Sequence, residues 1–172
     1  MLSDKINVRT ITSMGMLLCL AIVLSFLEGM IPPLPALPPG VKLGLSNIVV
    51  IYCIFFLNAK KAFGIVVLKS FFVFLTRGVS AGLISICGGL LSVLIMVIAL
   101  HSKKFSILII SIFGAVSHNV GQLFASSLLL QSNTVFYYLP ILIISGVLMG
   151  TLTATFTKMV LPVLKKISGK KE

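Results

Sequence analysis

Long apolar runs, separated by short turns of basic or polar residues, make up most of this sequence. Hydrophobic residues account for 58% of the chain and charged residues for 10%, whereas a soluble domain has about 25% charged residues. A strand that crosses a membrane alternates apolar and polar residues over about 10 positions, and these runs do not alternate. A helix needs about 20 predominantly apolar residues to cross the same thickness. The sequence therefore predicts an all-α integral membrane protein.

Six of the runs have the character of a membrane-spanning helix, so we expect one transmembrane domain over residues 1–172. The predicted spans cover about 10–30, 43–57, 62–76, 81–100, 105–130 and 138–161. We expect the first run to be a true span rather than a cleaved signal peptide, because no pair of small residues in cleavage spacing follows its apolar core.

The basic residues are unevenly divided between the two sides of this arrangement. Of the fourteen Lys and Arg, Lys42 and Arg77 fall outside, Lys69 falls within a span, and the other eleven fall towards one side. Because cytoplasmic loops carry an excess of Lys and Arg, both termini are predicted to be cytoplasmic, with residues 162–172 as a basic tail. The net charge of +11 then reflects orientation in a bacterial plasma membrane. We expect a lipid bilayer, and no nucleic acid, as partner.

Proline dominates the segment between the first two predicted spans. Five of the seven prolines lie between Pro32 and Pro39, and each of them fixes φ and removes a backbone donor. Residues 31–42 are therefore predicted to form a stiff extracellular loop that closes over a ligand. Lys42 and Asn47 come at the end of this segment, and we expect them to begin the wall of the ligand site.

Acidic residues are too few for several kinds of chemistry. Asp4, Glu28 and Glu172 are the only carboxylates, and two of them lie in the terminal tails. Magnesium-dependent chemistry on a diphosphate needs several clustered carboxylates, and ATP hydrolysis needs a glycine-rich phosphate loop that this sequence lacks. The three cysteines show no metal-binding spacing. We therefore expect no enzyme, no bound metal and no cofactor.

The fifth predicted span carries a row of polar residues at helical spacing. Its members are His118, Asn119, Gln122 and Ser126. On a helix this spacing predicts a single polar stripe, and polar groups inside a membrane are expensive to bury. Two interpretations stay open: the stripe reads the polar head of a ligand, or it joins helices through hydrogen bonds.

Charged residues mark the first and third predicted spans. Arg77 and Lys42 are predicted to place two cations beneath the loop, with Glu28 as the only acid able to balance them. An excess of cations favours an anionic ligand. The alternative is that Arg77 reaches the outer lipid headgroups, and Lys69 either joins the site or reaches the inner headgroups. An apolar wall is expected from three phenylalanines, Phe71, Phe72 and Phe74.

Small residues recur on one face of the fourth predicted span. They are Gly78, Gly82, Ser85, Gly89 and Ser92, and Gly146 and Gly150 repeat the spacing in the last span. Such faces let helices approach closely, so we predict close helix packing. Ser85 is in addition a candidate for the ligand site.

Three motifs carry a resemblance to a known family. They are Pro39-Gly-Val-Lys-Leu-Gly-Leu-Ser-Asn47, Ser85-Ile-Cys-Gly-Gly-Leu-Leu-Ser92 and Gly114-Ala-Val-Ser-His-Asn-Val-Gly-Gln122. In their order and spacing, over about residues 17–153, the chain resembles the Gx transporter family. That family is also labelled heptaprenyl diphosphate synthase component I, and it is similar to the substrate-binding S components of energy-coupling factor (ECF) vitamin transporters.

The resemblance implies a six-helix S-component fold, with a ligand pocket in the outer half of the membrane closed by the loop between the first two helices. A membrane-embedded T protein and paired ATPases would supply the energy. S components often dock on the T protein through Ala-x-x-x-Ala on the first helix. The nearest equivalent here is Gly15-x-x-x-Cys19, so Gly15 and Cys19 are the expected docking residues.

The leading hypothesis is the substrate-binding subunit of an importer for a small anionic molecule: vitamin-like, flavin-like, or a quinone or isoprenoid precursor. One alternative is a non-catalytic membrane partner of isoprenoid or quinone biosynthesis, or of flavin-linked extracellular electron transfer. Another is a component of heptaprenyl diphosphate synthase, against which the small number of carboxylates argues.

Overall fold

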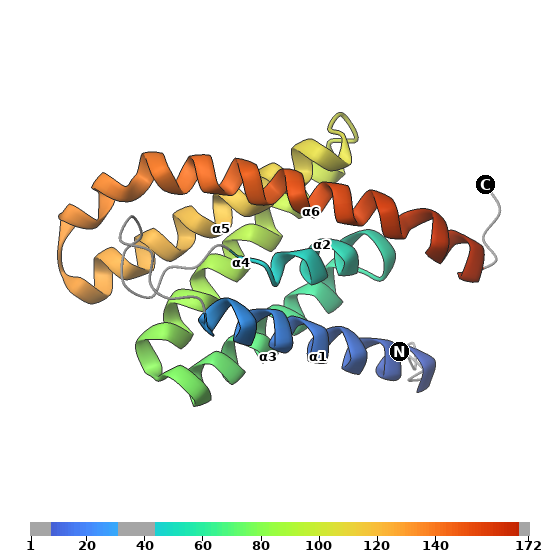
Figure 1. The fold of residues 1–172 in the computed structure, drawn as a ribbon, viewed down its shortest axis with the longest axis horizontal. Helices are drawn as coiled ribbons and strands as arrows, with labels where there is room; N and C mark the ends of the chain where they lie inside the picture. The colour runs from blue at the N-terminus through green and yellow to red at the C-terminus, as the bar shows by residue number, and fades with distance from the viewer. Residues whose placement is uncertain (1–7, 31–43, 169–172) are drawn as a thin grey trace, which may run out of the picture.

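The computed structural model describes residues 8–30 and 44–168, which contain helices and turns but no strand (Figure 1). The helices are α1 (Val8–Met30), α2 (Asn47–Phe56), α3 (Ala59–Arg77), α4 (Val79–His101), α5 (Ile107–Leu130), the short 3₁₀ helix η1 (Asn133–Tyr138) and α6 (Leu139–Ser168). The predicted all-α class is confirmed. The predicted loop 31–42, and with it Lys42, lies outside the described residues.

Helix boundaries follow from local backbone chemistry. The side chains of Asn58 and Ser106 accept hydrogen bonds from backbone N–H groups in the first turns of α3 and α5, as residues that precede a helix commonly do. Gly78 separates α3 from α4 with φ +89°, a conformation that glycine adopts without strain. The chain therefore reverses between α3 and α4 within a single residue.

Four helical segments in the described part of the chain are long and apolar enough to cross a membrane. They are Ile11–Met30, Val79–His101, Ile107–Leu130 and Asn133–Met159. These segments indicate a membrane-embedded protein. The third predicted span corresponds to α3, which has 19 residues but carries three Lys and one Arg, so the count of six spans stays a prediction.

The second predicted span, 43–57, is longer than the helix that forms there. α2 has 10 residues, so at a rise of about 1.5 Å per residue it covers about 15 Å, half of a hydrocarbon core of about 30 Å. The helix does not begin at the start of the apolar run because Gly44 has φ +86°. α2 is therefore a half-length helix whose first residue lies inside the molecule.

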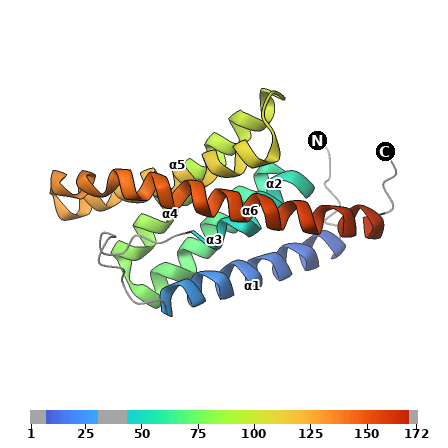
Figure 2. The ribbon, with the colours of Figure 1, turned by 45° about the horizontal axis from the view of Figure 1, so that its top comes forward.

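α2 is the centre of the bundle. The other helices pack as a series in which α1 contacts α3, α3 contacts α4, α4 contacts α5 and α5 contacts α6, while α2 contacts all of them. Val49, Val50, Ile51 and Cys53 of α2 are almost fully buried in the apolar core. Figures 1 and 2 show that the start of α1 and the end of α6 lie at the same end of the molecule.

Small residues let α4, α5 and α6 approach closely, and Gly150 is one of the residues predicted to do so. A Cβ atom added to Gly121 of α5 would lie 2.9 Å from the Cα of Gly88 in α4. A Cβ atom on Gly150 of α6 would lie 2.5 Å from the Cα of Ile112 in α5. Real Cβ atoms do not come this close to backbone, so larger residues would push the helices apart.

Candidate functional site

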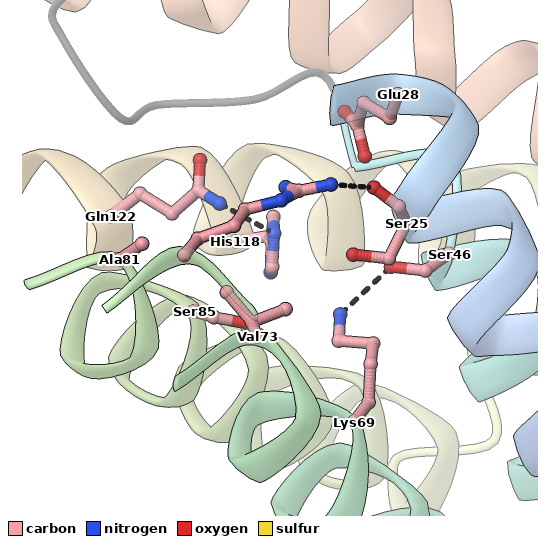
Figure 3. Close-up of a pocket in the computed structure, with 10 residues that line it drawn as sticks. Ser25, Glu28, Ser46, Lys69, Val73, Ala81, Ser85, His118 and Gln122 are labelled. Atoms are coloured by element: carbon pink, nitrogen blue, oxygen red, sulfur yellow. Dashed lines mark hydrogen bonds between the residues drawn. The ribbon is translucent and has the colours of Figure 1, made fainter. Parts of the chain in front are cut away.

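A small polar cavity lies where α1, α3, α4 and α5 meet the chain just before α2 (Figure 3). It is lined by Ser25, Glu28, Ser46, Lys69, Val73, Arg77, Ala81, Ser85, His118 and Gln122. Its volume is about 20 Å³, enough for about one water molecule. The residues that α1 and α4 contribute lie in the last turns of α1 and the first turns of α4, and Arg77 is the last residue of α3. The cavity therefore lies away from the end of the molecule where α1 begins and α6 ends.

Helical spacing explains how each helix presents its residues to this cavity. Lys69, Val73 and Arg77 follow at steps of four along α3. His118 and Gln122 are four apart on α5. Residues three or four apart lie on one face of a helix, so each helix contributes side chains that are one turn apart.

Lys69 points into the cavity from the middle of α3, although only 2% of its surface is exposed. Its Nζ donates a hydrogen bond of 2.8 Å to the Oγ of Ser46, the residue before α2 (Figure 3). Lys69 therefore lines the cavity with its ammonium directed inwards, and its part in binding a ligand stays a prediction.

Arg77, the last residue of α3, crosses from α3 to α1. Its Nη2 donates a hydrogen bond of 2.5 Å to the backbone oxygen of Ser25. The guanidinium lies directly against Gly29, where an added Cβ would stand 1.8 Å from Nη2. The Nη1 atom is buried and has no hydrogen-bond partner among the described residues. Arg77 thus joins two helices and keeps a buried donor free.

Glu28 faces these cations from α1, with 6% of its surface exposed. Its Oε1 accepts a hydrogen bond from the backbone N–H of Gly44, which ties the end of α1 to the chain before α2. Neither Lys69 nor Arg77 donates to the Glu28 carboxylate, since the hydrogen bonds of both cations go to the oxygens of serines. The cavity therefore holds two cations and one carboxylate without a direct ion pair between them.

His118 and Gln122 form the α5 side of the cavity, and both are buried. Their side-chain nitrogens lie 3.0 Å apart (Figure 3). An amide nitrogen is only a donor, so in this arrangement His118 Nε2 accepts the hydrogen bond and carries no proton. Nearby, the hydroxyls of Ser85 and Ser70 lie 3.1 Å apart and join α4 to α3.

The predicted single stripe on α5 is divided between two faces. The side-chain nitrogen of Asn119 donates to the backbone oxygen of Leu142 at 2.8 Å and to the Oγ of Ser145 at 3.2 Å, both in α6. Asn119 therefore joins helices instead of lining the cavity, because successive residues of a helix are rotated by about 100°. Ser126 is also buried but does not line the cavity.

Asn47 lies beside the cavity without lining it. It is the first residue of α2, 3% exposed, and its side-chain nitrogen and oxygen have no hydrogen-bond partner among the described residues. A Cβ added to Gly44 would lie 3.1 Å from the Asn47 side-chain nitrogen and 3.2 Å from the ring of His118. Gly44 thus separates Asn47 from His118.

The predicted phenylalanine wall is wrong. Phe71 and Phe74 are 58% and 40% exposed, and their rings stack on each other with centroids 6.3 Å apart. Phe72 does not line the cavity either. Because Lys69 and Val73 turn inwards, Phe71 and Phe74 face the surroundings, which in a membrane are lipid.

Four lining residues were not predicted: Ser25, Ser46, Val73 and Ala81. Helical spacing was a usable signal for two of them, since Ser25 is three residues before Glu28 and Val73 is midway between two cations of α3. Ser46 gave no such signal, because its place depends on where α2 begins.

The two expected docking residues, Gly15 and Cys19, lie on an exposed part of α1, and no atom lies within 4 Å of a Cβ added to Gly15. Beside them is an almost entirely apolar hollow of about 280 Å³ between α1, α2 and α6. It is lined by Leu17, Leu20, Ile48, Val49, Tyr52, Phe156 and Thr157. The surface of α1 therefore leaves room for a neighbour.

A family model described as heptaprenyl diphosphate synthase component I matches residues 17–160. The chain belongs to this family. The match covers most of the chain and confirms the resemblance indicated by the three motifs, and it includes every residue that lines the cavity. Comparison with curated proteins and with solved structures gave no match.

Proposed function

We propose that this chain is the substrate-binding membrane subunit of an importer for a small anionic molecule and resembles the S components of ECF transporters. The observation that carries the proposal is the buried polar cavity, in which Lys69 and Arg77 have no carboxylate bound directly to them. A chain that only needed to hold its helices together would not require two such cations inside a membrane.

The energetics of burial support a ligand in this cavity. A charged side chain at the centre of a membrane helix is unfavourable by about 2.5–3.5 kcal/mol or more. A hydroxyl such as that of Ser46 offsets only part of this penalty for Lys69, whereas an anion offsets much more. A small vitamin-like, flavin-like, quinone-precursor or isoprenoid-precursor acid would supply both the anion and an apolar body.

The proposed arrangement in the membrane follows from the basic residues. We propose six membrane segments, with α2 as a half-length segment and both termini in the cytoplasm of a bacterial plasma membrane. The cavity then opens towards the outside, next to the connection between α1 and α2. We propose that residues 31–42, which include Lys42, close over it there.

Partner subunits would use a different surface. We propose that an ECF T protein with its ATPases docks on the exposed part of α1 around Gly15 and Cys19, where the neighbouring apolar hollow could take apolar side chains of the partner. This surface lies on α1 well before the cavity residues Ser25 and Glu28, so docking and ligand binding do not compete for the same atoms.

A second candidate function is favoured by the description of the family. That description, heptaprenyl diphosphate synthase component I, indicates a chain that accompanies a prenyl synthase. With three carboxylates in the whole sequence, such a role would be non-catalytic, because magnesium sites for diphosphates need several clustered acids.

Native mass spectrometry of the protein purified in mild detergent tests the proposal. We expect a retained small anion that disappears in the Lys69→Met variant but stays in Lys60→Met, because Lys60 is an exposed cation of the same helix. Co-purification with a T protein and ATPases would support the importer. Co-purification with a prenyl synthase, with no retained small molecule, would favour the second candidate instead.

A further inference from the structure

The charges that line the cavity do not cancel. Lys69 and Arg77 contribute two positive charges and Glu28 one negative charge, while His118 Nε2 accepts a hydrogen bond from the Gln122 amide, so the imidazole adds no charge. Among the residues that the structure describes, the cavity lining therefore carries one positive charge in excess. A ligand with one negative charge would make the site neutral, and a ligand with two would leave it negative.

Glu28 is fixed in this site and is not free to move away from a ligand. Its carboxylate is buried and accepts a hydrogen bond from the backbone of Gly44. Gly44 is itself confined, because a Cβ atom added there would lie 3.1 Å from the side chain of Asn47 and 3.2 Å from that of His118. Any anion that enters the cavity must share it with the Glu28 carboxylate.

The N–H groups of Arg77 and Lys69 that have no partner in the described part of the chain fit a ligand head group with two oxygens. Nη1 of Arg77 has no partner among the described residues, and the ammonium of Lys69 has three donors, of which Ser46 takes one. A carboxylate accepts hydrogen bonds at two oxygens, and pairs well with a guanidinium. The cavity of about 20 Å³ holds about one water molecule, so any head group larger than that must displace lining side chains as it enters.

We propose that Glu28 is the specificity-determining residue of this site and limits its ligands to those whose head group carries a single negative charge, a carboxylate in particular. This inference rests on the proposed function. A phosphate ester or a diphosphate would place a second negative charge beside Glu28, and juxtaposed like charges in an enclosed site disfavour binding.

Thermal unfolding of the purified full-length protein in detergent tests this proposal, with benzoate, inorganic phosphate and pyrophosphate as probes. At a pH of about 8 the phosphate probe is mostly doubly charged. We expect benzoate to raise the unfolding temperature of the wild type with a half-saturating concentration at least about tenfold lower than that of pyrophosphate. Glu28→Gln keeps a side-chain oxygen for the Gly44 N–H but removes the charge. The ratio of the half-saturating concentration of pyrophosphate to that of benzoate should therefore fall about tenfold or more.

Asn133→Lys is the matched control, because it also makes the protein one charge more positive, on the exposed turn between α5 and α6. It should leave the ratio unchanged. A wild type that prefers pyrophosphate, or that no benzoate concentration stabilises, would overturn the proposal even if Glu28→Gln did not fold. A Glu28→Gln variant that folds and keeps the wild-type ratio of half-saturating concentrations would also overturn it. A doubly charged molecule retained in native mass spectrometry would overturn the charge limit while supporting the importer.

Discussion

Arg77 reaches the cavity because the position beneath its guanidinium is a glycine. Gly29 is in the last turn of α1, and its missing side chain leaves the space through which Arg77 bonds the backbone oxygen of Ser25. The sequence identified Arg77 as a cation near the outer end of a span. It did not show the role of Gly29, since that role depends on how α1 and α3 are rotated against each other.

The first prediction is that Gly29→Ala weakens ligand binding without unfolding the protein. An added Cβ would overlap Nη2 of Arg77, which is the end of a flexible side chain and can move away. Losing that placement should weaken binding about fivefold, equivalent to about 1 kcal/mol for one hydrogen bond. Titration of the retained ligand into both proteins measures the effect. Gly15→Ala, on the same helix with open space around it, should bind like the wild type.

The second prediction separates two neighbours on α5. Asn119→Ala should lower the free energy of unfolding by about 0.5–2 kcal/mol, because it removes hydrogen bonds to α6, and should leave ligand affinity unchanged. Unfolding titrations and ligand titrations on the same preparations measure the two effects. An Asn119→Ala variant with wild-type stability and weakened ligand binding would show that Asn119 belongs to the ligand site.

At the scale of elements, apolar runs and basic turns predicted where most helices lie but not how they face one another. The predicted spans 81–100 and 105–130 agree closely with α4 and α5. The start of α2 could not be predicted, because it depends on the left-handed backbone of Gly44, and α6 continues to Ser168 beyond the predicted end at 161. The sequence also did not show how α5 is rotated about its own axis. An unbroken polar spacing does not tell which residues face α6 and which face the cavity.

The third prediction concerns the close contact between α4 and α5. Gly121→Ala would place a Cβ 2.9 Å from backbone atoms of Cys87 and Gly88, and backbone cannot move aside as a side chain can. We expect a loss of about 1–3 kcal/mol in the free energy of unfolding, as for other overpacked sites. Gly64→Ala in α3 meets only a methionine methyl at 4.0 Å and should be neutral or stabilising. Equal unfolding temperatures for the two variants would contradict the packing described for α4 and α5.

At the scale of the whole molecule, the start of α1 and the end of α6 lie at one end (Figure 2). The cavity lies away from that end, between the last turns of α1 and the first turns of α4. The sequence predicted this arrangement because its basic residues collect towards one side. The sequence could not predict that Lys69 is buried, because composition alone does not distinguish a buried lysine from one that extends to the headgroups.

The fourth prediction is the orientation of the bundle. A cysteine at Ser132, in the turn between α5 and α6, should react with a membrane-impermeant thiol reagent in intact cells. A cysteine at Ser168, at the end of α6, should react only after the cells are opened. Labelling of position 168 from outside would place the cavity in the cytoplasmic half of the membrane and contradict the importer.

The central claim is that the cavity between α1, α3, α4 and α5 binds the ligand. The most direct test uses the small molecule that the wild type retains. Its affinity is measured for the wild type and for the Arg77→Ala and Gln122→Ala variants, with Lys60→Ala as an exposed control on α3. Each cavity variant should bind at least about 1 kcal/mol more weakly while keeping the unfolding temperature of the control. Wild-type affinity in both cavity variants, with weakened binding in Lys60→Ala, would contradict this assignment and move the site to the other end of the molecule.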